Sequence, residues 1–138
     1  MNLQTALAVR HHTNGDPKDV LAVEPIDVPV PQPDEAVVAL RCASINPSDM
    51  GMIGGSYGRL RALPAIAGRE GVGEVVAVGA DVKNVTIGTR VRFPEEPGVW
   101  REAGTFKAAD LIEIPENVPT EQAAQAFVNG LTAYVLLE

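Results

Sequence analysis

Glycine and proline recur so often in this chain that most of it can form only short extended segments. The 138 residues include 13 glycines and 11 prolines, and the stretches between them favour strands because they are apolar and β-branched. Short strands separated by such turns at about 8–12 residues are typical of a barrel or a sandwich. We therefore expect a mainly β fold, with strands at Gln4–Val9, Val20–Val28, Ala36–Ile45, Gly71–Gly79, Thr89–Phe93, Val99–Ala108 and Leu111–Ile114.

Two regions depart from the strand pattern. The segment after Ile45 opens with a turn at residues 46–49 and continues as a glycine-rich loop from Gly51 to Gly58. Near the end of the chain, Pro119 and Glu121 stand where the start of a helix tolerates them. Apolar residues then follow at helical spacing, with no glycine or proline to stop the helix. We predict a β-barrel catalytic domain over residues 1–120 and a helical connection over residues 121–138.

Charge and hydropathy exclude two classes of partner. The formal net charge is −7 and the isoelectric point is near 4.8, so the chain as a whole repels the phosphates of nucleic acids. No apolar run approaches the roughly 20 residues that span a membrane. Residues 1–9 have neither the pattern of a secretory signal nor that of an organelle leader, so we expect a cytoplasmic protein without nucleic-acid or membrane partners.

The candidate metal ligands do not form a convincing zinc site. A zinc ion binds a tetrahedral set of cysteine, histidine or carboxylate ligands. The only histidines, His11 and His12, are adjacent, so in an extended segment their side chains point to opposite faces. Cys42 has no second cysteine to pair with. We expect no zinc.

The sequence also contains no complete phosphate-binding fingerprint. Gly71-Val-Gly73 begins like a dinucleotide-binding motif, but Val76 stands where the third glycine is required. The motif must also follow a strand and open a helix, whereas these glycines lie at the start of a predicted strand. We interpret them as residues that allow close packing between strands.

The glycine-rich loop carries the best candidate for catalysis. Tyr57 stands between Ser56 and Gly58, where a mobile loop can present its hydroxyl to a cleft as a proton donor or oxyanion partner. A tyrosine that only packs is the alternative. Arg59, with two more arginines nearby, forms either a solvated basic rim or an anchor for a phosphate-bearing carrier. Trp100, the only tryptophan, lines an acyl pocket or fills the end of the barrel.

Several segments resemble the signature blocks of medium-chain dehydrogenases/reductases, in the same order along the chain. They are residues 45–49 (INPSD), 68–79 (GREGVGEVVAVG), 88–91 (GTRV) and 131–134 (LTAY). Residues 55–58 (GSYG), 63–64 (LP), 98–101 (GVWR) and 128–130 (VNG) most resemble 2-enoyl thioester reductases, although proline is usual at Gly130. The quinone oxidoreductases are the next most similar group.

This resemblance implies a GroES-like, partly open β-barrel with short helices, followed by a C-terminal helix that leads toward an absent Rossmann domain. It also supports the zinc argument. In the zinc-dependent members, the positions similar to Asn46, Arg69 and Val128 hold the metal ligands, and this chain has no segment similar to their four-cysteine lobe. The resemblance therefore implies a zinc-independent enzyme.

The implied function is NADPH-dependent reduction of α,β-unsaturated carbonyl compounds, with trans-2-enoyl thioesters as substrates. By this resemblance Tyr57 is the catalytic residue, and Asn129, Thr132 and Asn46 contact or border the cofactor. Trp100 and Arg59 are the expected substrate-binding residues. NADPH would bind mainly to a nucleotide-binding half missing from this chain, and we expect the complete protein to form a homodimer.

Two alternatives stay open. A quinone oxidoreductase of the same superfamily would share the fold, but Tyr57 would matter little to its reaction. A non-catalytic barrel that works as a fragment or a binding module would need neither the tyrosine nor the cofactor.

Overall fold

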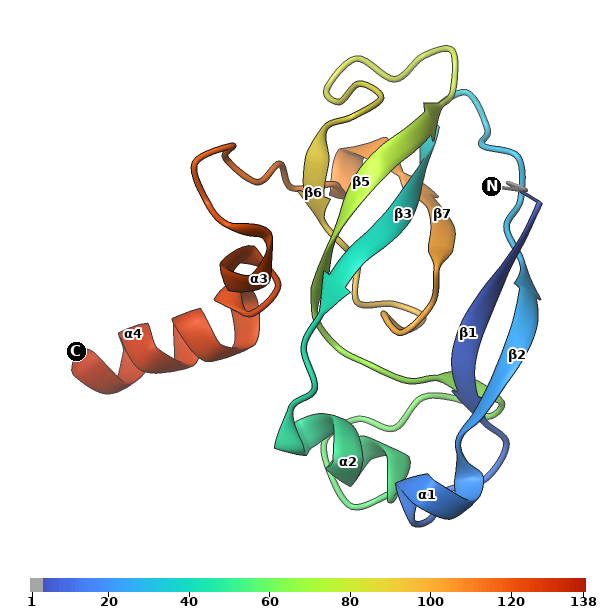
Figure 1. Ribbon diagram of the computed structural model, residues 1–138, viewed down its shortest axis with the longest axis vertical. Helices are drawn as coiled ribbons and strands as arrows, with labels where there is room; N and C mark the ends of the chain where they lie inside the picture. The colour runs from blue at the N-terminus through green and yellow to red at the C-terminus, as the bar shows by residue number, and fades with distance from the viewer. Residues whose placement is uncertain (1–3) are drawn as a thin grey trace.

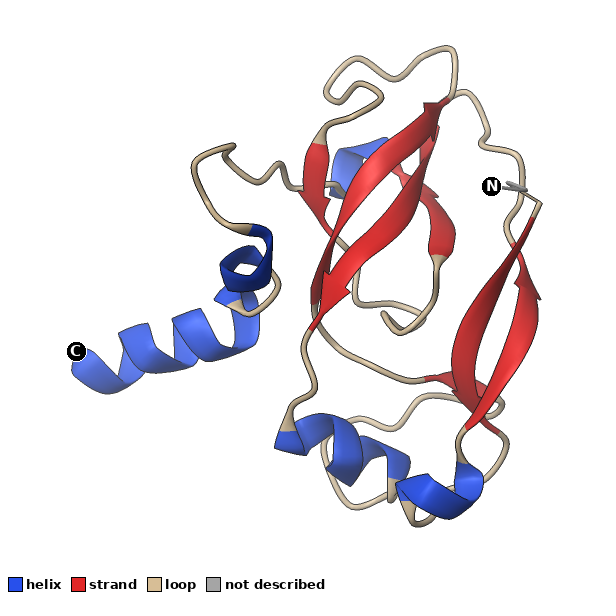
Figure 2. Ribbon diagram, viewed as in Figure 1, coloured by secondary structure: helices blue, strands red, loops and turns tan. Residues whose placement is uncertain are grey.

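The computed structural model describes residues 4–138 and consists of two antiparallel sheets with short helices at their margins (Figures 1 and 2). Residues 1–3, the beginning of the predicted barrel domain, lie outside the described part. The smaller sheet has the strand order β2-β1-β4 and the larger has the order β6-β5-β3-β7. The strands are β1 (Thr5–His11), β2 (Ala22–Asp27), β3 (Glu35–Ala43), β4 (Ala65–Ile66), β5 (Gly71–Val78), β6 (Arg90–Arg92) and β7 (Ala103–Lys107).

The two sheets are joined at one side but do not close into a complete barrel. The Val9 N–H donates to the Trp100 carbonyl at 2.8 Å, and Ala8 forms an isolated antiparallel bridge with Arg101. This joint leads directly into β7, the edge strand of the larger sheet. The predicted mainly β, partly open architecture is therefore confirmed.

Strand β3 is central because apolar cores cover both of its faces. Ala36 and Val38 pack into one cluster with Val75, Val91 and Phe93. Val37 faces the other way and packs with residues of β1 and β7. Strand β5 pairs with β3 at close range, since a Cβ added at Gly73 would lie 2.5 Å from Val38 Cγ1. The interpretation of the glycines at the start of β5 as packing residues agrees with this contact.

The short helices are α1 (Pro17–Val20), α2 (Pro47–Ile53), a 3-10 turn at Ala108–Asp110, and α3 (Thr120–Ala123). Helix α2 replaces the turn predicted at residues 46–49 and extends to Ile53, into the beginning of the loop predicted from Gly51 to Gly58. The prediction was wrong because it treated the glycines as breakers and overlooked the helix start: Pro47 is the first helical residue, and the Asp49 carboxylate accepts the Asn46 N–H at 2.7 Å. The predicted strand at 111–114 contributes only an isolated bridge, between Glu113 and Val91.

The C-terminal segment is helical, as predicted, but irregular. After α3 the chain forms a π-helical turn at Ala126–Gly130 and then α4 (Leu131–Leu137), which projects away from the sheets (Figure 1). Ala123 and Ala124 pack against Val72 of β5, which attaches α3 to the larger sheet. The side chains of α4 are exposed. No helix among the described residues is long and apolar enough to cross a membrane.

Candidate functional site

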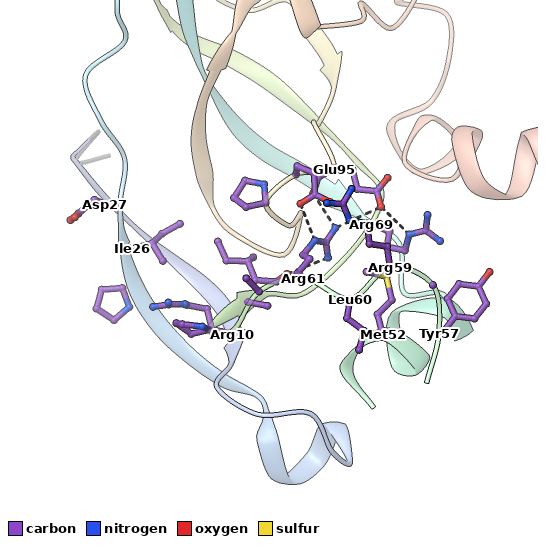
Figure 3. Close-up of a pocket in the computed structure, with 18 residues that line it drawn as sticks. Arg10, Ile26, Asp27, Met52, Tyr57, Arg59, Leu60, Arg61, Arg69 and Glu95 are labelled. Atoms are coloured by element: carbon purple, nitrogen blue, oxygen red, sulfur yellow. Dashed lines mark hydrogen bonds and ion pairs between the residues drawn. The ribbon is translucent and has the colours of Figure 1, made fainter. Parts of the chain in front are cut away.

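A cavity of about 1280 Å³ lies beside the loop that carries Tyr57. Asp27 and Ile26 of β2 lie on one side of it, and Tyr57 and Arg59 lie on the other (Figure 3). The cavity is lined by four arginines but by only three acidic residues, in a chain whose net charge is −7. We refer to it as the arginine-lined cavity; its charged lining residues are Arg10, Asp27, Arg59, Arg61, Arg69, Glu95 and Glu96.

Tyr57 is half exposed at the cavity, with 52% of its surface accessible. Its backbone is held against α2, because a Cβ added at Gly51 would lie 2.7 Å from Tyr57 Cβ. Within residues 4–138 its hydroxyl makes no hydrogen bond to the protein. The hydroxyl is therefore free to bond a ligand, which a tyrosine buried for packing could not do.

The arginines of the cavity differ in whether they already form ion pairs with acidic side chains. Arg61 contacts Glu95 and Glu96, and Arg69 donates to Glu95 at 3.0 Å. The hydrogen bond to Glu95 raises the pKa of Arg69, and burial opposes this shift. Arg59 is exposed and has no ion pair in the described part of the chain. Arg59 is thus the cavity arginine most available to an anionic ligand.

Arg101 donates to the carbonyl of the cavity residue Glu96 at 3.5 Å and is buried without a carboxylate partner within the described range. Its guanidinium stacks on Phe106 at 4.8 Å and on Phe93 at 5.5 Å. Burial, together with the nearby charge of Arg61, lowers the pKa of Arg101 to about 10. Arg101 therefore stays protonated at neutral pH and adds positive potential to this side of the barrel.

Asn46 lies in a separate, buried group of polar residues. Its side-chain nitrogen donates to Glu70 Oε1 at 3.0 Å and to Ser44 Oγ at 2.9 Å. Ser44 Oγ also donates to Glu70 Oε1, and the Val128 N–H donates to Glu70 Oε2 at 2.7 Å. We call Ser44, Asn46, Glu70, Val128 and Asn129 the Glu70 cluster. Its hydrogen bonds link the end of β3 to the segment that precedes α4.

Asp49 is a second buried carboxylate next to this cluster. Its Oδ2 accepts the Asn46 N–H, whereas its buried Oδ1 has no partner in the described structure. Burial raises the pKa of Asp49; the hydrogen bond from Asn46 and the charge of Arg69 oppose the shift. Asn46 therefore lies between two buried acids, donating its backbone N–H to Asp49 and its side-chain amide to Glu70.

The two other residues expected to contact a cofactor lie close to Asn46. Asn129 is exposed, and its Nδ2 donates to Asn46 Oδ1 at 3.5 Å, a long hydrogen bond. Thr132 is exposed on α4, where its hydroxyl donates to the Val128 carbonyl. The structure therefore brings Asn46 and Asn129 together, with Thr132 one helical turn further on.

Trp100 contacts Ser44 of the Glu70 cluster and does not line the arginine-lined cavity. Its indole N–H donates to the Ser44 carbonyl at 3.1 Å, and its ring covers Gly68, where an added Cβ would lie 2.3 Å from Trp100 Cδ1. Its packing against the core agrees with the reading that it fills the end of the barrel. The assigned role in substrate binding stays a prediction.

The expectations of no zinc ion and no pyrophosphate-binding motif concern absences, and the side chains described here do not test them. Among residues 4–138, no three histidine, cysteine or acidic side chains gather into a group that could hold a metal ion. His11 is buried and bonds the Thr13 carbonyl, whereas His12 is exposed and contacts Glu24. The glycines of β5 pack against β3 and leave no space for a pyrophosphate. Zinc independence stays a prediction.

Glu70 and Asp49 are two site residues that could not be singled out from the sequence. Both appeared only inside signature blocks, yet both are about 1% exposed. The available signal was a carboxylate at the edge of an apolar strand, between Arg69 and Gly71. A charged group in such a position is rarely buried without hydrogen-bond donors.

Comparisons with known proteins agree with this arrangement. Residues 32–116 match the family model of the alcohol dehydrogenase GroES-like domain. The chain is 42% identical over 134 residues to the mitochondrial enoyl-acyl-carrier-protein reductase of Bos taurus, and the match covers 96% of this chain and 35% of that protein. The chain thus spans about a third of the length of this relative.

Two solved structures are similar over nearly the whole chain. Etr1p of Candida tropicalis, in complex with NADP and crotonyl-CoA, has 30% identity and a TM-score of 0.88, and the match covers 96% of this chain and 43% of that one. The quinone oxidoreductase of Coxiella burnetii has 29% identity and a TM-score of 0.79, with coverage of 96% and 44%. Both groups anticipated from the signature blocks are therefore among the similar proteins.

Proposed function

Because this chain belongs to the family of alcohol dehydrogenase GroES-like domains, we propose that it is the catalytic half of an NADPH-dependent reductase. The proposed substrates are α,β-unsaturated carbonyl compounds, specifically trans-2-enoyl thioesters. The bovine relative is named as an enoyl-acyl-carrier-protein reductase, and Etr1p was solved with crotonyl-CoA, an enoyl thioester. In this proposal residues 1–120 form the catalytic barrel, and residues 121–138 lead to a nucleotide-binding half.

The observation that carries the proposal is the unpaired Tyr57 hydroxyl at a positively charged cavity. When an enoyl thioester is reduced at its β-carbon, negative charge develops on the thioester oxygen. A hydroxyl without an internal partner can donate a hydrogen bond to that oxygen, where stabilisation of charge lowers the barrier. The hydroxyl can instead transfer its proton to the α-carbon and recover one from solvent.

NADPH, when bound, would supply the hydride. The chain's contribution is position: Asn46 and Asn129 offer amide groups close together, and Thr132 lies next to them. These groups fit the polar end of a nicotinamide. A pyrophosphate does not fit the described residues, because they contain no strand, glycine turn and helix in sequence. Most of the affinity for the cofactor would therefore come from the nucleotide-binding half.

Arg59 and Trp100 complete the proposed substrate site. Arg59 is the free cationic group of the cavity and would pair with a phosphate of the thioester's carrier. Trp100 would contribute an apolar wall for the acyl chain, although it lies apart from the cavity lining. Charge and a half-exposed tyrosine at one cavity favour a substrate with an anionic carrier over a simple quinone.

The decisive test is Tyr57→Phe in the protein that includes the nucleotide-binding half. The variant should retain its fold and cofactor binding but lose about 10²–10³ in kcat for enoyl thioesters, because only the hydroxyl is removed. Tyr134→Phe is the matched control, since Tyr134 is the other tyrosine and is 61% exposed on α4. Near wild-type reduction of thioesters by Tyr57→Phe would reject the assignment.

The second candidate is a quinone oxidoreductase, which the similarity to the Coxiella burnetii enzyme favours. The same variant separates the two functions: full quinone turnover by both proteins, with no thioester reduction by either, would establish the alternative. A non-catalytic barrel would turn over neither substrate. The bovine relative is named as mitochondrial, which stands against the predicted cytoplasmic location. Imaging of a tagged protein tests this point, and light scattering tests the proposed homodimer.

A further inference from the structure

We propose that Glu70 is a positioning residue that fixes the direction of the Asn46 amide and attaches residues 126–130 to the barrel. Its carboxylate is 1% exposed. Within residues 4–138 no arginine, lysine or histidine forms an ion pair with it. A buried charge without a cation must be compensated by hydrogen-bond donors. Here the donors are Ser44, Asn46 and the Val128 N–H, and Asn46 is one of the residues that the proposed function places beside the cofactor.

The first consequence concerns Asn46. A carboxylate accepts hydrogen bonds and donates none, so the Asn46 side chain must present its nitrogen to Glu70, at 3.0 Å. Its carbonyl oxygen must then face the opposite direction, where it accepts from Asn129 Nδ2. Glu70 therefore determines which end of each amide is used inside the cluster. The Asn129 oxygen stays available as an acceptor for a ligand's N–H or O–H.

The second consequence concerns the π-helical turn. The Val128 N–H donates to Glu70 Oε2 at 2.7 Å, the shortest hydrogen bond of the cluster. The carboxylate thus satisfies a backbone donor in the irregular turn between α3 and α4. One residue earlier, Phe127 lies 4.1 Å from the Arg92 guanidinium of β6. These two contacts hold the start of α4 against the larger sheet, and only the contact with Glu70 also reaches Asn46.

Glu70→Gln tests the proposal in the chain as it stands, with Glu74→Gln as its control. Glu74 lies on β5, which begins directly after Glu70, but it is partly exposed, and its partner is Arg41 at the surface. In Glu70→Gln the new amide nitrogen must replace one of the two carboxylate oxygens, so it faces either the Val128 N–H or the Asn46 nitrogen. Because both of these groups are donors, the hydrogen bond on that side is lost. Either the Val128 amide then exchanges about tenfold faster, or the side-chain NMR signals of Asn46 and Asn129 shift. Neither change should occur in Glu74→Gln. Absence of both changes in Glu70→Gln would overturn the proposal.

A double variant with the donor and the acceptor exchanged tests the direction of the Asn46 amide. It also distinguishes a hydrogen-bonding role of Glu70 from a role in packing alone. In Glu70→Gln combined with Asn46→Asp, the donor and the acceptor exchange places, so a hydrogen bond can form again between positions 46 and 70. The Val128 exchange rate and the Asn129 signals should return toward those of the original chain. If the double variant instead shows the sum of the two single effects, Glu70 only fills space. This comparison stays valid if Glu70→Gln is unstable.

The effect on catalysis rests on the proposed function and has its own readout. In the protein with its nucleotide-binding half, Glu70→Gln should lower kcat about tenfold and leave the KM for the thioester within about twofold, since the amides act on the reacting complex. If the NMR changes occur while kcat is unchanged, the catalytic consequence is wrong. If the original protein reduces no thioester but the NMR changes occur, the proposed function fails and the role of Glu70 in orienting Asn46 stands.

Discussion

The Glu70 cluster and the arginine-lined cavity differ in whether their polar side chains find hydrogen-bond partners within the fold. In the cluster, a buried carboxylate accepts from Ser44, Asn46 and Val128, so the positions of all these residues are determined together. At the cavity, the Tyr57 hydroxyl and the Arg59 guanidinium are exposed and make no hydrogen bond or ion pair within residues 4–138. The Glu70 carboxylate is satisfied within the fold, whereas the cavity retains hydrogen-bonding capacity for a ligand.

This difference separates a rigid part of the proposed site from an adaptable one. Residues whose hydrogen bonds are satisfied by the fold keep their geometry without a ligand. Residues on an exposed loop can adjust to ligands of different shape. Of the proposed cofactor contacts, Asn46 and Asn129 lie in the rigid part, and the proposed substrate contacts Tyr57 and Arg59 lie in the adaptable part. A fixed cofactor position with a tolerant substrate pocket would follow.

The largest expected effect is a loss of stability when a glycine is replaced by alanine. Gly68, next to Trp100, and Gly58, on the loop of Tyr57, provide one such position near each region. Gly68 has a φ of +86°, and a Cβ there would lie 2.3 Å from the Trp100 ring; Gly58 has a φ of +68° and open space around it. Gly68→Ala should lower the free energy of unfolding by about 3 kcal/mol, from backbone strain and overpacking together. Gly58→Ala should cost about 1 kcal/mol, from strain alone. Equal losses in urea denaturation would contradict the distinction between the regions.

A smaller effect should follow from the buried acid next to the cluster. Burial raises the pKa of Asp49 above its ordinary value of 3.8, so the folded state holds its proton to higher pH than the unfolded state. Stability from this group therefore falls as pH rises from about 3.8 through the raised folded value. Asp49→Asn keeps an acceptor for the Asn46 N–H and removes this dependence. Urea unfolding at a series of pH values measures the difference in pH dependence between the two proteins; parallel curves would show that Asp49 does not titrate in this way.

Titration with NADPH tests whether the rigid part can bind the cofactor without a nucleotide-binding half. We expect residues 1–138 to bind it weakly or not at all, because phosphate contacts anchor such cofactors and the described residues offer no cradle for them. Calorimetry gives the affinity, and chemical shifts identify the contacts. Micromolar binding would show that the amides of the cluster hold more of the cofactor than we infer.

The smallest expected effect is that of metal removal. Asn46 fills the space between two acids by donating to both, so neither region needs an ion to compensate its charges. Chelators should leave the melting temperature unchanged, and elemental analysis should find no stoichiometric zinc. One tightly bound zinc per chain would mean that the positions of Asn46 and Arg69 have been misread.

Several features could be predicted from local chemistry. The strands β1, β3 and β5 followed from apolar runs between turns, and the packing role of Gly73 followed from its place within a strand. Helix α2 could have been predicted too, since Pro47 and Asp49 are typical of a helix start. The glycines that follow favour a loop, and this outweighed the helix-start residues in the prediction. Strand β4 has two residues, Ala65 and Ile66, and pairs only because β1 lies beside it.

The sequence by itself determined the mainly β class, the family and the identity of Tyr57 as a candidate, because these depend on residue types in a fixed order. Only the tertiary structure decided that Glu70 holds Asn46 and Val128, which lie 24 and 58 positions away along the chain. A carboxylate in a sequence carries no sign of burial or of its donors. Its role depends on which distant donors the fold places around it, and only the packing of β5 against β3 and the C-terminal segment determines them.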